Sequence, residues 1–102
     1  MSSLADLQAV TTETRSRRGF VTDPLKLLAL LTEEVGEVAT EIKRSWSDNY
    51  GEFDCDQLKE EIADVFVLLA ALASRHGIDL ERAVVEKFLE KDSARKWNTS
   101  VE

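Results

Sequence analysis

The sequence has 102 residues, of which 43% are hydrophobic and 32% charged, and this length suits one domain rather than two. Its 13 basic and 20 acidic residues give a net charge of −7, which disfavours nucleic-acid binding but not nucleotide binding, because a bound cation reverses the local field. The single Cys55, the lack of a signal-peptide core and the shortness of every apolar run predict a cytoplasmic protein with no membrane partner.

The predicted elements are all helices, because the sequence contains neither an alternating β-branched run nor an Asn-Gly hairpin turn. A weakly amphipathic first helix is expected over about residues 4–17. Asp23 followed by Pro24 is typical of a helix start and begins a second helix that reaches about Trp46. The apolar stripe of this second helix consists of Leu27, Leu31, Val35, Val38 and Ile42.

The third helix follows a short polar loop and is expected to begin at Asp54 or Asp56. It reaches His76, and the next residue, Gly77, is of the type that most often ends a helix. A fourth helix is expected to run to about Trp97. Four helices in a chain of this length predict an all-α fold, a four-helix bundle.

Two pairs of acidic residues lie on the second and third helices: Glu34 with Glu37, and Glu61 with Asp64. Each pair is spaced i, i+3, so its two carboxylates share one helix face. Asp64 is the one polar residue between positions 62 and 73, and we expect it to be buried, where a carboxylate is costly unless it is paired or binds a metal. Four inward carboxylates would form an oxygen-rich site for a hard cation such as Mg²⁺.

Other acidic residues nearby are weaker candidates. On a helical wheel Glu33 lies on the outer face of the second helix, so Glu34 is the better ligand of the two. Glu41 lies on the same flank as Glu34 and Glu37. We nevertheless expect Glu33, Glu41 and Glu60 to belong to a solvated face with ordinary helical ion pairs.

The third helix is apolar on two sides, of which the first is expected to be its main core face: Ile62, Val65, Phe66, Leu69 and Leu72. The side beyond Asp64 is also apolar and carries Val67, Ala70 and Ala71. Four helices in so short a chain do not easily cover both sides. The second face therefore predicts a partner subunit, in a homodimer or homotetramer.

The acidic residues also carry a family resemblance. The segment E-E-V-G-E at 33–37, followed by E-I-A-D at 61–64, resembles the two acidic blocks of the MazG-like all-α nucleoside triphosphate pyrophosphohydrolases. The segment H-G-I-D-L at 76–80 and the basic-aromatic tail at 91–97 match as well, so the resemblance covers about residues 24–97 of a single MazG-like domain spanning 1–102.

The resemblance implies Mg²⁺-dependent hydrolysis of a (deoxy)nucleoside triphosphate between its α- and β-phosphates, with Mn²⁺ as a possible substitute. The products would be a nucleoside monophosphate and pyrophosphate, and the role one of cleaning the nucleotide pool. The resemblance also implies dimers or tetramers with sites at subunit contacts. Carried over by motif, Glu34, Glu37, Glu61 and Asp64 would be the metal ligands and catalytic residues, with the carboxylate that orients the water left open between Glu37 and Glu61.

Three basic residues, Lys87, Lys91 and Arg95, are spaced by four and would share one face of the fourth helix. The family tail favours Lys91 and Arg95 as ligands of the triphosphate, whereas Lys87 is expected to be solvated. Three arginines near the end of the first helix could serve similarly but are expected to be solvated loop residues: Arg15, Arg17 and Arg18.

A nucleobase would need an aromatic platform, and we select Trp46 and Trp97 as substrate-binding residues, with Phe20 and Tyr50 as further candidates. Each of these aromatic residues could equally pack in the core or at an interface. Relatives specific for deoxycytidine triphosphate often have a Trp at the position of Arg44, so this departure leaves the base open.

The sequence leaves two alternatives to the enzyme. The chain could be a non-catalytic helical module that binds a partner through its apolar helix face. A di-iron bundle would need Glu-x-x-His pairs, and the single His76 argues against it.

Overall fold

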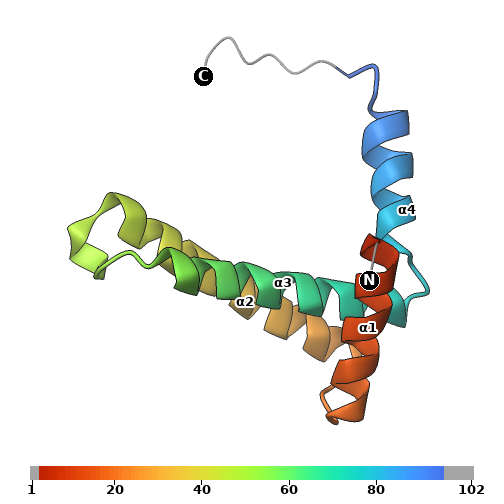
Figure 1. Cartoon of the computed structure of the whole chain (residues 1–102), viewed down its shortest axis with the longest axis horizontal. Coiled ribbons are helices and arrows are strands. Elements are labelled where there is room, and N and C mark those ends of the chain that lie inside the picture. Colours follow the sequence, from red (N-terminus) through yellow and green to blue (C-terminus); the bar gives the residue numbers. More distant parts are fainter. Residues whose placement is uncertain (1–2, 96–102) are drawn as a thin grey trace.

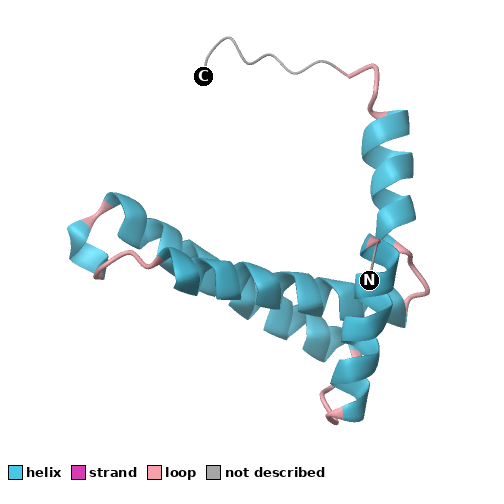
Figure 2. Ribbon diagram, viewed as in Figure 1, coloured by secondary structure: helices cyan, strands magenta, loops and turns pink. Residues whose placement is uncertain are grey.

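The computed structural model describes residues 3–95, and within that range every regular element is helical (Figures 1 and 2). The all-α prediction is confirmed, and so are both ends of the first two helices. The elements are α1 (Leu4–Arg17), α2 (Pro24–Trp46), a 3₁₀ turn η1 (Asp48–Tyr50), α3 (Cys55–Arg75), α4 (Leu80–Val84) and a π-helical segment η2 (Val85–Lys91).

The predicted helix starts arise from side-chain caps. The Asp23 carboxylate accepts hydrogen bonds from the backbone N–H groups of Leu25 and Lys26, at 2.9 and 3.1 Å, and Pro24 takes the first helical position, where no N–H is needed. Asp54 caps α3 in the same way.

The end of α3 is fixed by Gly77, as predicted. Gly77 has a φ of +68°, a conformation that costs glycine nothing. Its N–H donates to the carbonyl of Ser74 at 3.1 Å, and the N–H of Ile78 donates to that of Ala73 at 2.9 Å. These two bonds form a Schellman motif, which turns the chain sharply from α3 toward α4.

The helices α2 and α3 form an antiparallel hairpin, with η1 at its closed end and α1 crossing its other end (Figure 1). The core lies where these three helices meet and contains Leu27, Leu68 and Ala71, with Leu31 and Leu72 packed against it. The fourth helix packs on α1, and η2 continues from it away from the hairpin (Figure 1). Within this chain, therefore, the fourth helix does not close a bundle around α2 and α3.

A buried Gln8 joins α1 to the turn after α3. Its side-chain amide donates to Ser74 Oγ at 3.0 Å and to the carbonyl of Ile78 at 2.8 Å, and its oxygen accepts from the N–H of Leu80 at 2.9 Å. A polar residue at this place satisfies three polar groups of the turn, and it thereby fixes α1 across the open end of the hairpin.

The predicted core face of α3 is correct only in part, because Leu72 packs against the core and Val65 and Phe66 are half-buried. The helix buries Leu68, Ala70 and Ala71, whereas Ile62 and Leu69 remain 52% and 40% exposed. The physical reason is that α1 and α2 both pack against α3, and small alanine side chains allow a close approach. The apolar surface left open on α3 is thus the Ile62–Leu69 side rather than the side of Ala70 and Ala71.

The fourth helix also differs from the prediction, because helical geometry ends at Lys91 instead of continuing to about Trp97. From Val85 the turns widen to the π type, and the N–H of Asp92 donates to the carbonyl of Lys87 five residues earlier, at 3.1 Å. No helix within residues 3–95 combines the length and the apolar character that crossing a membrane requires.

Candidate metal and nucleotide site

Carboxylates occupy the second half of the seam between α2 and α3. Leu27 and Leu31 fill the half near α1, and the same seven-residue repeat then brings Glu34 and Glu41 to the positions that follow. Glu34 is partly buried and Glu41 only 4% exposed. The hairpin therefore carries acids where hydrophobic residues would stabilise it more.

Three carboxylates converge at the middle of the hairpin: those of Glu34, Glu61 and Asp64, called here the acidic trio. Each offers an oxygen atom, and these atoms all lie within 4.8 Å of one another. Glu61 is positioned by Gln57, whose side-chain amide donates to its Oε1 at 2.7 Å. An oxygen set of this kind and spacing suits a hard divalent cation.

The electrostatics of Glu34 fit such a cation. Burial raises the pKa of the Glu34 carboxyl, and a hydrogen bond with Glu61 raises it further, together with the negative charges of Asp64, Glu61 and Glu37. Its Oε2 atom is buried and has no hydrogen-bond partner within residues 3–95. A divalent cation would give this oxygen a partner and would remove the repulsion between the carboxylates.

The predicted ligands behave differently from one another. Glu37 is exposed and stays outside the trio, although it lies near enough for its charge to act on Glu34. Asp64 joins the trio but is exposed in this chain, so its predicted burial is wrong, because no described element covers that side of α3. Glu33 is exposed on the outer face, as expected.

A cavity of about 420 Å³ opens on the α1 side of the trio. It brings Arg15, Arg18 and Phe20 to the same space as Glu34 and Asp64. The guanidinium of Arg15 lies 5.2 Å from the centre of the Phe20 ring and donates to the carbonyl of Val21 at 3.0 Å. Arg15 and Arg18 were expected to be solvated; Arg18 is exposed and Arg15 partly buried, and both line this cavity beside the carboxylates. The cavity is completed by Thr11, Thr14, Leu30, Val67 and Leu68.

Sequence reasoning ranked these arginines low because their contact with the acids depends on the crossing of α1 over the hairpin. The one local signal was the sequence Arg17-Arg18 followed by Gly19 and Phe20. Gly19 has a φ of +75°, and the resulting turn brings Phe20 back beside Arg15.

A second cavity, of about 430 Å³, opens on the other side of the trio, toward the closed end of the hairpin. Glu61 belongs to both the trio and this cavity, and the other lining residues are polar: Glu37, Thr40, Glu41, Arg44, Glu52, Asp54 and Gln57. Glu41 was expected on a solvated face and is instead buried, where it forms an ion pair with Arg44.

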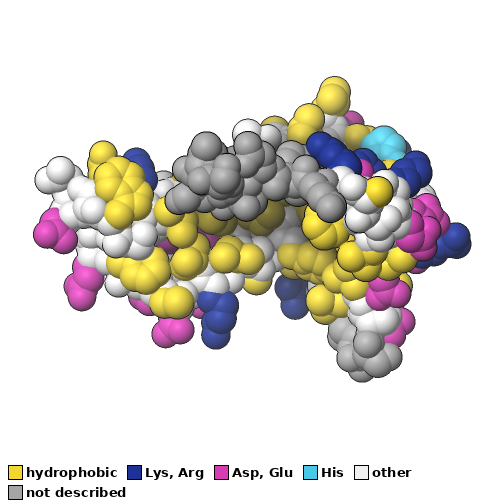
Figure 3. Space-filling view, turned by 90° about the horizontal axis from the view of Figure 1, so that it is seen from above, with side chains coloured by type: hydrophobic (Ala, Val, Ile, Leu, Met, Phe, Trp, Pro, Cys, Tyr) yellow, Lys and Arg dark blue, Asp and Glu magenta, His cyan; other side chains and the backbone are white. Residues whose placement is uncertain are grey.

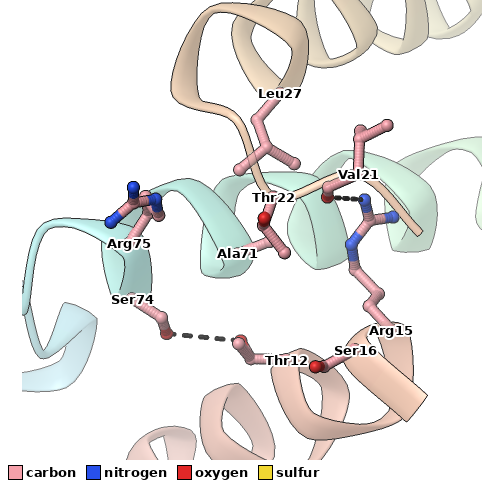
Figure 4. A pocket seen from close by; sticks show the side chains of 9 residues that line it. All are labelled: Thr12, Arg15, Ser16, Val21, Thr22, Leu27, Ala71, Ser74 and Arg75. Carbon is pink, nitrogen blue, oxygen red and sulfur yellow. Dashed lines mark hydrogen bonds between the residues drawn. The ribbon is translucent and has the colours of Figure 1, made fainter. Parts of the chain in front are cut away.

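A third cavity, of about 270 Å³, lies between α1, the segment before α2 and the end of α3 (Figure 4). Figure 4 shows the Thr12–Ser74 hydrogen bond on one side and the bond from Arg15 to Val21 on the other. None of the four predicted acidic ligands lines it. Arg15 lines this cavity as well as the one beside the trio.

Among the described residues, the predicted substrate-binding side chains do not gather at the trio. Lys91 ends η2 and Arg95 lies beyond it, next to Asp92, so the predicted shared helix face of these bases is not formed. Neither residue lines the two cavities that border the carboxylates. Trp46 is 67% exposed and packs edge-on against Tyr50, and Trp97 lies outside the described residues.

Two comparisons with known proteins bear on this site. The family model of the MazG nucleotide pyrophosphohydrolase domain matches residues 22–99, a range that includes all four predicted acidic ligands. An uncharacterised protein of Bacillus subtilis (strain 168), YpjD, is 37% identical over 84 residues, which cover 78% of this chain and 75% of YpjD.

Proposed function

Since the chain belongs to the MazG nucleotide pyrophosphohydrolase family, we propose that it hydrolyses (deoxy)nucleoside triphosphates to a nucleoside monophosphate and pyrophosphate. The observation that carries this proposal is the acidic trio of Glu34, Glu61 and Asp64, with its unpartnered buried oxygen. A role in cleaning the nucleotide pool belongs to the same proposal.

The trio residues Glu34, Glu61 and Asp64 would hold the divalent cation. Bound Mg²⁺, or Mn²⁺ in its place, supplies neutralisation of the charge on the phosphate oxygens and polarisation of the phosphoryl group. Three carboxylates on two packed helices would hold the cation before substrate arrives, so binding would need little reorganisation.

Glu37 is the best candidate to orient the attacking water and to accept its proton. It is exposed and lies outside the trio, so it does not need to act as a ligand. Glu61, the other candidate, already accepts a hydrogen bond from Gln57. A general base must reach a water while its carboxylate remains free, and the exposed position of Glu37 beside the trio supports this role.

Arg15 and Arg18 would bind the phosphates that lie beyond the trio. Their cavity is continuous with Glu34 and Asp64, and Arg15 is held in place by the carbonyl of Val21 and the face of Phe20. A guanidinium held in this way binds phosphate oxygens through two parallel hydrogen bonds. Lys91 and Arg95 would act on the same phosphates only from a neighbouring subunit.

The test is an assay of purified protein with each nucleotide and Mg²⁺, in which pyrophosphate and single phosphate are resolved. Monophosphate and intact pyrophosphate should appear, and chelator or replacement of Mg²⁺ by Ca²⁺ should stop the reaction. Asp64→Asn should reduce turnover by about 100-fold or more while the far-ultraviolet spectrum stays native.

The matched control is Glu33→Gln, which removes an exposed carboxylate from the outer face of α2 and should leave turnover within about twofold. Formation of a nucleoside diphosphate with single phosphate would make the protein a different phosphohydrolase. If no nucleotide were consumed, a partner-binding role for the exposed apolar surface would become the better interpretation.

A further inference from the structure

Arg44 is held in one orientation at the closed end of the hairpin. Its Nη1 is paired with Oε1 of the buried Glu41, and its Nε donates to the backbone carbonyl of Tyr50 at 2.8 Å. The Ser47 hydroxyl accepts the N–H of Asn49 and so shapes the turn that presents this carbonyl. The guanidinium is therefore fixed from two sides before any ligand binds.

The fixed guanidinium keeps unused donors. Arginine has five N–H groups, and within residues 3–95 no hydrogen bond involves Nη2 of Arg44. Arg44 lines the 430 Å³ cavity and is partly exposed to it. A ligand in this cavity would thus meet a planar fork of N–H donors that requires two neighbouring acceptors.

The other residues of the cavity limit what that ligand can be. Five carboxylates line it, of which Glu41 is paired with Arg44 and Glu61 belongs to the trio. The other three would repel an anionic group: Glu37, Glu52 and Asp54. They do not form a second metal site, since within the described residues only the trio converges to ligand distances. A neutral ring that offers acceptors to Arg44 and N–H donors to the carboxylates satisfies both conditions, and a nucleobase is such a ring.

The cavity also lies at the correct place for a base. Glu61 belongs to it and to the trio, and Glu34 and Arg44 lie ten positions apart on α2, roughly 15 Å at the usual helical rise. The cavity of Arg15 and Arg18 lies on the opposite side of the trio. A nucleotide would thus lie along the hairpin groove, with its phosphates toward α1 and its base toward η1.

We propose that Arg44, held by Glu41, is the residue that selects the base of the substrate, and that it favours guanine and cytosine. Guanine presents O6 and N7, and cytosine presents O2 and N3, as adjacent acceptors for the fork. Adenine presents a donor beside N7, and uracil and thymine alternate acceptor, donor and acceptor. The carboxylates around Arg44 accept the amino or ring N–H of the two favoured bases. This inference rests on the proposed function.

The experiment compares kcat/KM for the deoxynucleoside triphosphates of guanine, cytosine, adenine and thymine. The unaltered protein should prefer the first two by about tenfold, the size of discrimination that a bidentate contact provides. Arg44→Lys keeps the charge but loses the fork, and Arg44→Gln loses both. Each variant should reduce the preference to about twofold or less, through KM, while the adenine and thymine nucleotides react as before. Arg82→Lys, which changes an exposed arginine paired with Glu86, should alter nothing.

Calorimetric binding of the four nucleoside monophosphates separates this inference from the proposed function. If no triphosphate is hydrolysed but guanine and cytosine monophosphates bind more tightly, and Arg44→Lys removes the difference, the proposed function fails and the base assignment stands. Hydrolysis without base preference, or a preference that persists in folded Arg44→Lys and Arg44→Gln, overturns the base assignment alone. If neither hydrolysis nor binding is found, both are overturned.

Discussion

At Glu34 the hairpin carries a carboxylate in a seam position that Leu27 and Leu31 occupy nearer to α1. A buried leucine at such a position would contribute roughly 1.5–3 kcal/mol through removal of apolar surface from water. Instead Oε2 of Glu34 is buried without a hydrogen-bond partner in the described chain, next to two further carboxylates. A residue that lowers folding stability in this way is expected at a site where a bound ligand offsets the lost stability.

Glu34→Gln tests this argument through the pH dependence of stability. Because burial and neighbouring charge raise the pKa of Glu34 in the folded state, folding favours the protonated form. The contribution of Glu34 to stability is fully present below its unfolded pKa of about 4.3 and is lost as pH rises through the folded pKa. In chelator, the glutamine variant should therefore unfold at a higher temperature than the unaltered protein at pH 8, and the difference should shrink toward pH 4.5.

Thermal unfolding followed by circular dichroism over pH 4.5–8, with chelator or with Mg²⁺, measures this difference. Mg²⁺ should raise the unfolding temperature of the unaltered protein, more strongly at pH 8 than at pH 5 because protons compete with the metal, and should leave the variant nearly unchanged. Identical pH profiles for the two proteins would show that Glu34 does not titrate in this range.

At the scale of single elements, the helix boundaries could be predicted because caps depend on neighbouring residues. Asp23 and Gly77 act on groups within five positions of themselves, and both were identified from the sequence. The spacing of the acids likewise selected four carboxylates, of which Glu34, Glu61 and Asp64 converge and Glu37 does not. The buried side of α3 could not be predicted in full, since this helix is apolar on two sides and the choice depends on which face α1 and α2 cover.

The parts of the site that depend on tertiary contact were missed for the same reason. Arg15 and Arg18 reach the trio only through the crossing of α1, and no periodicity in the sequence reports that crossing. Glu41 was misjudged because a charged residue on a helix flank is usually solvated, whereas here Arg44 and the turn at Tyr50 allow it to be buried.

The crossing of α1 should depend on Gln8. Gln8→Ala leaves the Ile78 carbonyl and the Leu80 N–H without their partner, and each buried unsatisfied group costs about 1–3 kcal/mol. We expect unfolding in urea to show a loss of about 2–4 kcal/mol. Glu13→Ala, at an exposed site on the same helix, should change stability by less than about 0.5 kcal/mol. If Gln8→Ala changed stability as little as Glu13→Ala, water would be replacing the Gln8 side-chain amide without cost.

At the scale of the whole molecule, the chain leaves much apolar surface uncovered. Apolar side chains gather along the hairpin on the face seen in Figure 3. On α3 the exposed residues Ile62 and Leu69 are seven positions apart and so share one face. On η2, which extends away from the hairpin, Phe88 is 63% exposed. So many exposed large apolar side chains are unusual for a monomer and support the proposal of a dimer or tetramer.

Leu69→Glu should split this assembly. The new carboxylate would lie, unpaired, on the apolar face that Leu69 shares with Ile62, and burying it against a partner would cost several kcal/mol. Light scattering at micromolar concentration should show two or four chains for the unaltered protein and one for the variant. Lys59→Glu adds an acid at an exposed polar position of α3 and should leave the assembly intact.

If Lys91 and Arg95 act on the substrate from a neighbouring subunit, Leu69→Glu should also lose hydrolysis while Mg²⁺ still binds the trio of each separate chain. A single-chain mass for the unaltered protein would rule out the assembly, and full activity in a monomeric variant would rule out the shared site.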